Sequence, residues 1–190
     1  MHFCRKRKIA KRDFRLENFG AKSKGANLLT RIGFTKVYKE VRPDKRYSPE
    51  EKAEIINDTI LGHNFLRDSG LPVGNEHGRV VIRGKERLVF DKERNIKSEE
   101  LNSRFKEIFS IIKEANRKGV YFDASPNNFG VDITGRIVIR DTNTTCAVKG
   151  ERALKAMLRD LEANLNPRNA YHREVLKKLR KEREKLMLVK

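Results

Sequence analysis

The chain has 190 residues, and its 44 Lys and Arg residues outnumber its 26 Asp and Glu residues, which gives a formal net charge of +18. This length accommodates one domain, or one domain built from two lobes. No stretch approaches the roughly 18 uncharged apolar residues of a membrane-spanning helix, and the charged N-terminus lacks the apolar core of a signal peptide. We therefore expect neither a transmembrane segment nor an export signal.

Apolar residues make up 37% of the chain, which is low for a globular protein, and charged residues also make up 37%, which is high. Ile, Leu, Val and Phe nevertheless recur in ordered blocks, which predicts a modest core and not a disordered polyelectrolyte. The two cysteines, Cys4 and Cys146, lie far apart and match no zinc-ligand spacing. Neither a disulfide framework nor a zinc site is indicated, and we expect a reducing, cytoplasmic compartment.

Positive charge is concentrated at the two ends of the chain. Clustered Lys and Arg gain affinity for phosphate backbones by releasing counterions, so nucleic acid or an anionic surface stays open as a partner of the basic termini. The two clusters comprise Arg5, Lys6, Arg7, Lys8, Lys11, Arg12 and Arg15 near the start, and Arg173, Lys177, Lys178, Arg180, Lys181, Arg183 and Lys185 near the end.

The first elements follow a basic arm at residues 1–13. The pattern of residues 14–41 predicts strands, the last of them rich in Val and aromatic side chains. A helix is predicted from Ser48 to Gly70, because Ser48 is a favourable N-cap residue and Pro49 suits the first helical turn.

The middle of the chain continues with alternating strands and a helix. Residues 79–90 predict a hairpin with its turn at Gly84. Residues 98–118 have the apolar spacing of a single long helix. Two short strands, at 129–131 and 137–139, then predict a second hairpin.

The last elements are helices at 151–164 and from 167 to the end. The whole order predicts a single α+β domain over residues 1–190. Its N-terminal lobe, residues 14–92, would hold an antiparallel sheet and one helix. Its C-terminal lobe, residues 93–190, would be reduced, mostly helical, and completed by the basic last helix.

Three polar side chains are predicted to meet at one end of the second hairpin: Asp123 and Asn128 in the loop before it, and Asp141 just after it. Carboxylate and amide oxygens suit a hard divalent cation, and a further carboxylate nearby can act as a base. The alternative is an ordinary loop, because Asp and Asn are also common turn residues. The joint spacing of the three favours the metal site.

This spacing resembles the catalytic core of the protein-kinase-like superfamily, in the form found in RIO-type kinases, aminoglycoside phosphotransferases and small bacterial effector kinases. The resemblance implies that Asp123 is the catalytic-loop Asp and that Asn128 and Asp141 bind Mg²⁺. It extends over residues 14–145 and implies a minimal two-lobed protein-kinase-like fold that uses ATP. A secreted effector of this kind would act in the cytoplasm of a host cell.

Residues of the N-terminal lobe match the nucleotide-binding part of the same superfamily. Gly20, Ser23 and Gly25 belong to a segment that stands where a glycine loop covers the nucleotide, and its backbone N–H groups could bind phosphates. A plain hairpin turn is the alternative for the two glycines. The resemblance also implies that the segment 87–93, which includes Phe90, receives the adenine.

Lys39 ends a Val-x-Lys pattern, and strand alternation places it on the same face as Val37. The resemblance implies that Lys39 binds the α- and β-phosphates, with Lys36 as second choice. Its acidic partner should come from the following helix. Glu54 and Asp58 lie one turn apart there, and both stay open.

The sequence departs from the superfamily at several positions. Tyr121 stands where a His precedes the catalytic Asp, and we expect it in the core or as a hydrogen-bonding support of the loop. Thr142 and Asn143 replace the Phe-Gly that follows the metal-binding Asp, and no Ala-Pro-Glu element appears. We therefore expect a truncated, atypical kinase without a large helical substrate-docking portion.

The leading functional hypothesis is an ATP- and Mg²⁺-dependent phosphotransferase, in the form of a serine/threonine protein kinase acting on a protein hydroxyl. ATP and a protein substrate, an acidic one among the options, are its expected partners. The first alternative is a kinase of a small molecule or a lipopolysaccharide sugar. The second is a catalytically inactive kinase-like module that binds nucleic acid or an acidic partner.

Overall fold

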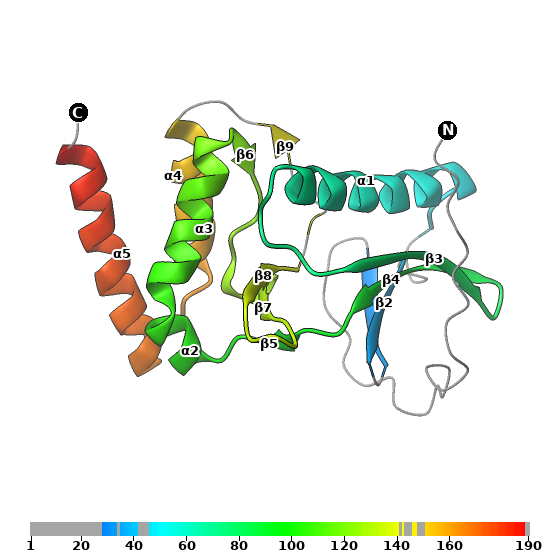
Figure 1. The fold of residues 1–190 in the computed structure, drawn as a ribbon, viewed down its shortest axis with the longest axis horizontal. Coiled ribbons are helices and arrows are strands. Elements are labelled where there is room, and N and C mark those ends of the chain that lie inside the picture. The colour runs from blue at the N-terminus through cyan, green and yellow to red at the C-terminus, as the bar shows by residue number, and fades with distance from the viewer. Residues whose placement is uncertain are drawn as a thin grey trace. The chain divides into compact units, whose positions relative to one another are not determined.

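The computed structural model describes residues 28–33, 35–41, 46–140, 142, 146–147 and 151–188 (Figure 1). The chain divides into two units. The first contains the chain up to Leu61 together with Gly74–Glu93, and the second contains Gly62–Val73 and Arg94–Lys190. The fold is α+β, as predicted. Among the described helices, none combines the length and the apolar character needed to cross a membrane.

The first unit is built on an antiparallel sheet of four strands in the order β1-β2-β4-β3. The strands are β1 (Leu28–Ile32), β2 (Lys36–Val41), β3 (Glu76–Ile82) and β4 (Lys85–Asp91). The turn between β3 and β4 uses positive φ angles of 52° at Arg83 and 73° at Gly84, which a two-residue hairpin favours. The predicted hairpin around Gly84 is thereby confirmed.

Alternation along the strands gives this sheet two different buried faces. Leu88 and Phe90 lie on the face that packs against Ile56 of α1 (Pro49–Asp68). Tyr38 and Val89 pack together on the opposite face. Val37 pairs with Phe90 and Lys39 pairs with Leu88 across β2 and β4. The face that carries Lys39 is therefore the face that receives α1.

Helix α1 starts and stops close to the predicted positions. The backbone N–H of Glu51 donates to Ser48 Oγ over 3.2 Å, and the backbone N–H of Ser48 donates to Glu51 Oε2 over 2.7 Å. This reciprocal pair satisfies amide groups that have no partner within the helix. The helix ends before Gly70, whose φ of 69° reverses the chain.

Within the described residues, the second unit contains the end of α1, four further α-helices and two small antiparallel sheets. The helices are α2 (Ser98–Ser103), α3 (Phe105–Arg117), α4 (Glu151–Ala163) and α5 (Ala170–Leu188). One sheet orders β5 (Arg94–Asn95), β7 (Phe129–Val131) and β8 (Ile137–Ile139). The other pairs β6 (Val120–Tyr121) with β9 (Cys146–Ala147).

Two predicted helices differ in detail from the observed ones. The single helix predicted over 98–118 is interrupted at Arg104, where φ is −99° and ψ is 15°. The interruption allows α2 to pack on α5 while α3 packs on α4. Helix α5 begins at Ala170 and not at 167, because Asn169 Oδ1 accepts the backbone N–H of Tyr171 and caps the helix there.

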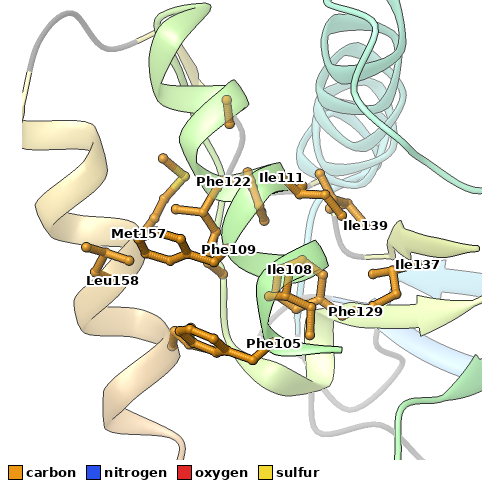
Figure 2. Packing of buried hydrophobic residues seen from close by; sticks show 14 of the residues in the cluster. Phe105, Ile108, Phe109, Ile111, Phe122, Phe129, Ile137, Ile139, Met157 and Leu158 are labelled. Carbon is orange, nitrogen blue, oxygen red and sulfur yellow. The ribbon is translucent and has the colours of Figure 1, made fainter. Parts of the chain in front are cut away.

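The core of the second unit surrounds α3, whose buried face meets β7, β8 and α4 (Figure 2). Phe122 and Phe129 are fully buried in this core, with their rings edge to face and 5.9 Å between centroids. They lie at the two ends of the loop that contains Asp123 and Asn128. Packing therefore fixes both ends of the candidate catalytic loop.

Candidate active site

The loop from residue 123 to 128 divides its side chains between the core and the surface. Ala124 and Pro126 are buried, whereas Asp123, Ser125 and Asn128 are half-buried. The last three residues of the loop, Pro126–Asn128, form one turn of 3-10 helix that leads into β7. The apolar side chains thus anchor the backbone while the polar ones remain accessible.

Asp123 is held by one of its two carboxylate oxygens. Its Oδ1 accepts hydrogen bonds from the backbone N–H of Ser125 over 3.0 Å and from Ser125 Oγ over 2.5 Å. Its Oδ2 accepts no hydrogen bond from any described residue. A carboxylate with one oxygen fixed and the other available can orient an incoming hydroxyl group and accept its proton.

Asn128 is held in the complementary way, through its amide nitrogen. Asn128 Nδ2 donates to the backbone carbonyl of Asp123 over 3.1 Å. The side-chain oxygen has no partner in the part of the chain that the structure describes. The atom of this side chain that remains available is therefore the amide oxygen, and Mg²⁺ binds such oxygens as ligands.

The hairpin β7–β8 links Asn128 to the position before Asp141. The backbone N–H of Arg140 donates to the carbonyl of Asn128 over 2.8 Å. Asp141 itself lies outside the described residues, as do Gly20, Ser23 and Gly25. The described residues contain no group of three His, Cys, Asp or Glu side chains that could hold a metal ion. Asn128 fits a Mg²⁺ site by the chemistry of its free oxygen, and the role of Asp141 stays a prediction.

The C-terminal end of α4 and the residue that follows it supply two polar side chains that the sequence did not single out. Asp160 Oδ2 accepts the hydroxyl of Tyr121 over 2.9 Å, and Asn164 Nδ2 donates to Ser125 Oγ over 2.9 Å. Burial, and then the negative charge of Asp123, raise the pKa of Asp160. Tyr121 is partly buried against the core, as one of its two predicted roles required, and support of the loop by its hydroxyl stays a prediction. The i, i+4 spacing of Asp160 and Asn164 was the one available signal in the sequence, and many exposed helix faces share it.

In the first unit, Lys39 and Phe90 lie side by side. The Nζ of Lys39 is 5.1 Å from the ring centroid of Phe90, a distance at which a cation and an aromatic face attract. Glu54 and Asp58 are both exposed on α1, and within the described residues neither forms an ion pair with Lys39. The pairing of Lys39 with either acid stays a prediction.

Lys36, the second choice for the phosphate lysine, lies on the other face of β2 and binds other groups. Its Nζ forms an ion pair with Asp91 Oδ1 at 2.5 Å and lies 2.8 Å from His77 Nε2. Asn75 Nδ2 also donates to Asp91, over 2.8 Å. Partial burial alone would raise the pKa of Asp91, but hydrogen bonds from Lys36, Asn75 and His77 outweigh it and lower the pKa to about 2. These contacts favour Lys39 over Lys36.

The same face of the sheet contains a buried ion pair that the sequence did not reveal. Arg87 Nε donates to Glu40 Oε2 over 2.7 Å, and the two side chains are 5% and 2% exposed. Arg87 Nη1 is also buried, and it has no hydrogen-bond partner among the described residues.

No protein-family model and no curated protein sequence matches this chain. Solved structures do match, and they show that this chain shares its fold with part of the protein WbdD. The structure of the bifunctional kinase-methyltransferase WbdD has a TM-score of 0.52 and 11% identity, and the match covers 83% of this chain and 43% of that one. Monomeric WbdD gives a TM-score of 0.51, 13% identity and coverages of 74% and 38%.

A third match is WbdD in complex with the kinase inhibitor LY294002, with a TM-score of 0.50, 12% identity and coverages of 87% and 45%. The matches therefore span less than half the length of these three solved chains. At such low identity the likeness concerns the fold alone.

Proposed function

We propose that this protein is an ATP- and Mg²⁺-dependent phosphotransferase, and that it acts as a minimal serine/threonine kinase on a protein hydroxyl. The observation that carries the proposal is the pair Asp123 and Asn128. One loop presents a free carboxylate oxygen and a free amide oxygen, and both side chains are fixed through their other polar atom. The kinase-like fold supports the same assignment.

Catalysis of phosphoryl transfer mainly requires that the protein positions the reactants and neutralises the charge of the phosphates. In the proposed reaction, the acceptor hydroxyl oxygen bonds to the γ-phosphorus of ATP, the bond from that phosphorus to the bridging oxygen breaks, and ADP leaves. Asp123 orients the hydroxyl through its free oxygen and receives its proton. Asn128 and Asp141 would hold Mg²⁺, which neutralises charge on the phosphates. Lys39 would bind the α- and β-phosphates.

The proposal gives the remaining residues of the first unit supporting roles. Phe90 would contact the adenine, and Glu54 or Asp58 would pair with Lys39 once nucleotide is bound. Gly20, Ser23 and Gly25 would cover the phosphates. Each of these roles follows from the kinase resemblance and from strand order.

The experiment is incubation of the protein with γ-³²P-labelled ATP, Mg²⁺ and a cell lysate. Label on proteins, lost when EDTA removes the metal, is the expected result. Label on small molecules or saccharides would support the alternative acceptor class and contradict the protein-kinase assignment. No transferred label would contradict phosphotransfer altogether and leave the binding module as the surviving hypothesis.

The site variant and its control lie in or next to the β7–β8 hairpin. Asp141→Ala should abolish transfer. Asp132→Asn should leave it intact, because Asp132 accepts hydrogen bonds from Thr134 and Arg136 in the turn and has no role in the proposed site. Transfer undiminished in Asp141→Ala would remove Asp141 from the mechanism.

A further inference from the structure

Asp160 is a half-buried acid that the proposed reaction does not use. Burial disfavours its ionised form, and the charge of Asp123 adds to the penalty, so its pKa is raised. An uncharged side chain at this position would avoid both the burial of a charge and the repulsion from Asp123. The hydrogen bond from the Tyr121 hydroxyl, at 2.9 Å, and the positive charge of Arg159 act in the opposite direction and offset part of this penalty.

Asn164 directly follows the last residue of α4, four positions after Asp160, and contacts Ser125 on the other side of Asp123 in the chain. Its Nδ2 donates to Ser125 Oγ over 2.9 Å, and that hydroxyl donates to Asp123 Oδ1 over 2.5 Å. The same nitrogen also donates to the backbone carbonyl of Asp160 over 2.9 Å. A continuous chain of hydrogen bonds therefore runs from α4 to the carboxylate of Asp123.

The two α4 contacts flank Asp123 symmetrically along the chain. Tyr121 precedes Asp123 by two residues, and Ser125 follows it by two. Tyr121 is bonded to Asp160 in the last turn of α4, and Ser125 is bonded to Asn164 directly after that turn. Helix α4 contacts α3 and β6, and its residues Met157 and Leu161 are buried in the core. A rigid helix thus holds the loop on both sides of its candidate base.

We propose that Asp160 and Asn164 are positioning residues, which hold the free oxygen of Asp123 where the acceptor hydroxyl must lie. This inference rests on the proposed function, because it assigns a role within the same site. A misplaced reacting group lowers the rate of the chemical step without weakening the binding of distant substrate groups. Loss of either contact should therefore lower kcat and leave ATP binding unchanged.

The test compares Asp160→Leu, Asp160→Asn, Tyr121→Phe and Asn164→Leu with the unsubstituted protein. The rate of ADP formation from Mg·ATP is measured with casein as the added hydroxyl acceptor, and ATP affinity is measured by calorimetry. Asp160→Leu, Tyr121→Phe and Asn164→Leu should each lower kcat about 3- to 10-fold, the range expected for loss of one hydrogen bond. ATP affinity should stay within about twofold of the unsubstituted value.

Asp160→Asn provides the conservative control, because its side-chain oxygen can still accept the Tyr121 hydroxyl. It should retain kcat within about twofold, since the proposed role depends on that hydrogen bond and not on charge. Ala163→Leu, at an exposed neighbouring position of α4, controls for added bulk on the helix surface and should also retain kcat.

Variants that melt at a lower temperature but keep kcat would overturn the positioning role while leaving the proposed function intact. Equal losses of kcat and ATP affinity would also overturn it, because they indicate general damage to the fold. No ADP formation by the unsubstituted protein would contradict the proposed function, and this inference with it.

Discussion

The hydroxyl of Ser125 donates a hydrogen bond to Asp123 Oδ1 over 2.5 Å, so the residue two positions after the candidate base holds that base in place. The backbone N–H of Ser125 donates to the same oxygen over 3.0 Å. Together the two bonds hold Oδ1, and the other carboxylate oxygen accepts no hydrogen bond from any described residue. In the proposed function, that second oxygen receives the acceptor hydroxyl.

The first prediction removes the Ser125 hydroxyl. Ser125→Ala leaves one hydrogen bond on Asp123 Oδ1 and releases the Asn164 amide, so kcat should fall about 3- to 10-fold. Steady-state kinetics should show little change in the KM for ATP. Ser125→Thr, which restores the hydroxyl, should recover most of the rate. Equal rates in all three proteins would show that the carboxylate needs no such support.

The second prediction concerns the Mg²⁺ requirement. Asn128→Ala removes the free amide oxygen, so the Mg²⁺ concentration that gives half-maximal transfer should rise. A titration of transfer rate against Mg²⁺ measures this change. Asn127→Ala is the matched control, because Asn127 is the exposed neighbour in the same 3-10 turn. An identical Mg²⁺ dependence in the two variants would remove Asn128 from the metal site.

The third prediction concerns the stability of the first unit. Arg87→Leu removes the guanidinium that pairs with the buried Glu40 carboxylate, which should cost about 3 kcal/mol in free energy of unfolding. Urea denaturation measures the loss. Replacing both residues, as Glu40→Leu with Arg87→Met, should restore much of the stability, because no uncompensated charge remains. A double variant less stable than Arg87→Leu would contradict this explanation.

The fourth prediction is a pH dependence at Asp91. Its pKa is lowered from 3.8 to about 2 in the folded protein, so its ionised form stabilises the fold. This contribution is fully present above pH 3.8 and is lost as the pH falls through 2. Because the side chain is 30% exposed, we expect about 1 kcal/mol after allowing for solvent screening.

Asp91→Asn provides the measurement of that contribution. Urea denaturation at pH 7 should show the variant to be less stable than the unsubstituted protein. The difference should shrink between pH 4 and pH 2, where the unsubstituted protein also loses its charge at this position. A difference that is constant over this range would show that the charge of Asp91 does not contribute.

Much of the fold could be predicted from the sequence because local signals agreed with the final packing. Ser48 and Gly70 mark the ends of α1, and Gly84 marks the turn of the β3–β4 hairpin. The break at Arg104 had no such signal, since neither Gly nor Pro stands there. It arises from tertiary packing, in which α2 and α3 contact different helices.

The candidate site likewise contains residues that a local sequence signal identifies and residues that only tertiary packing brings together. Asp123 and Asn128 could be found because a fixed spacing along one loop carries their chemistry. Asp160 and Asn164 are each 39 residues away in the chain from the residues that they bond, Tyr121 and Ser125, and only tertiary packing brings them near. The ion pair of Glu40 with Arg87 likewise depends on strand register, which one sequence does not specify.

The central claim is that Asp123 orients and deprotonates the acceptor hydroxyl. Its most direct test is single-turnover transfer of ³²P from γ-labelled ATP by Asp123→Asn, beside Asp132→Asn as the matched loss of a carboxylate. We predict that Asp123→Asn lowers the rate of transfer by about 10²- to 10⁴-fold with unchanged ATP affinity, and that Asp132→Asn retains it. A rate for Asp123→Asn equal to that of the unsubstituted protein would contradict the account.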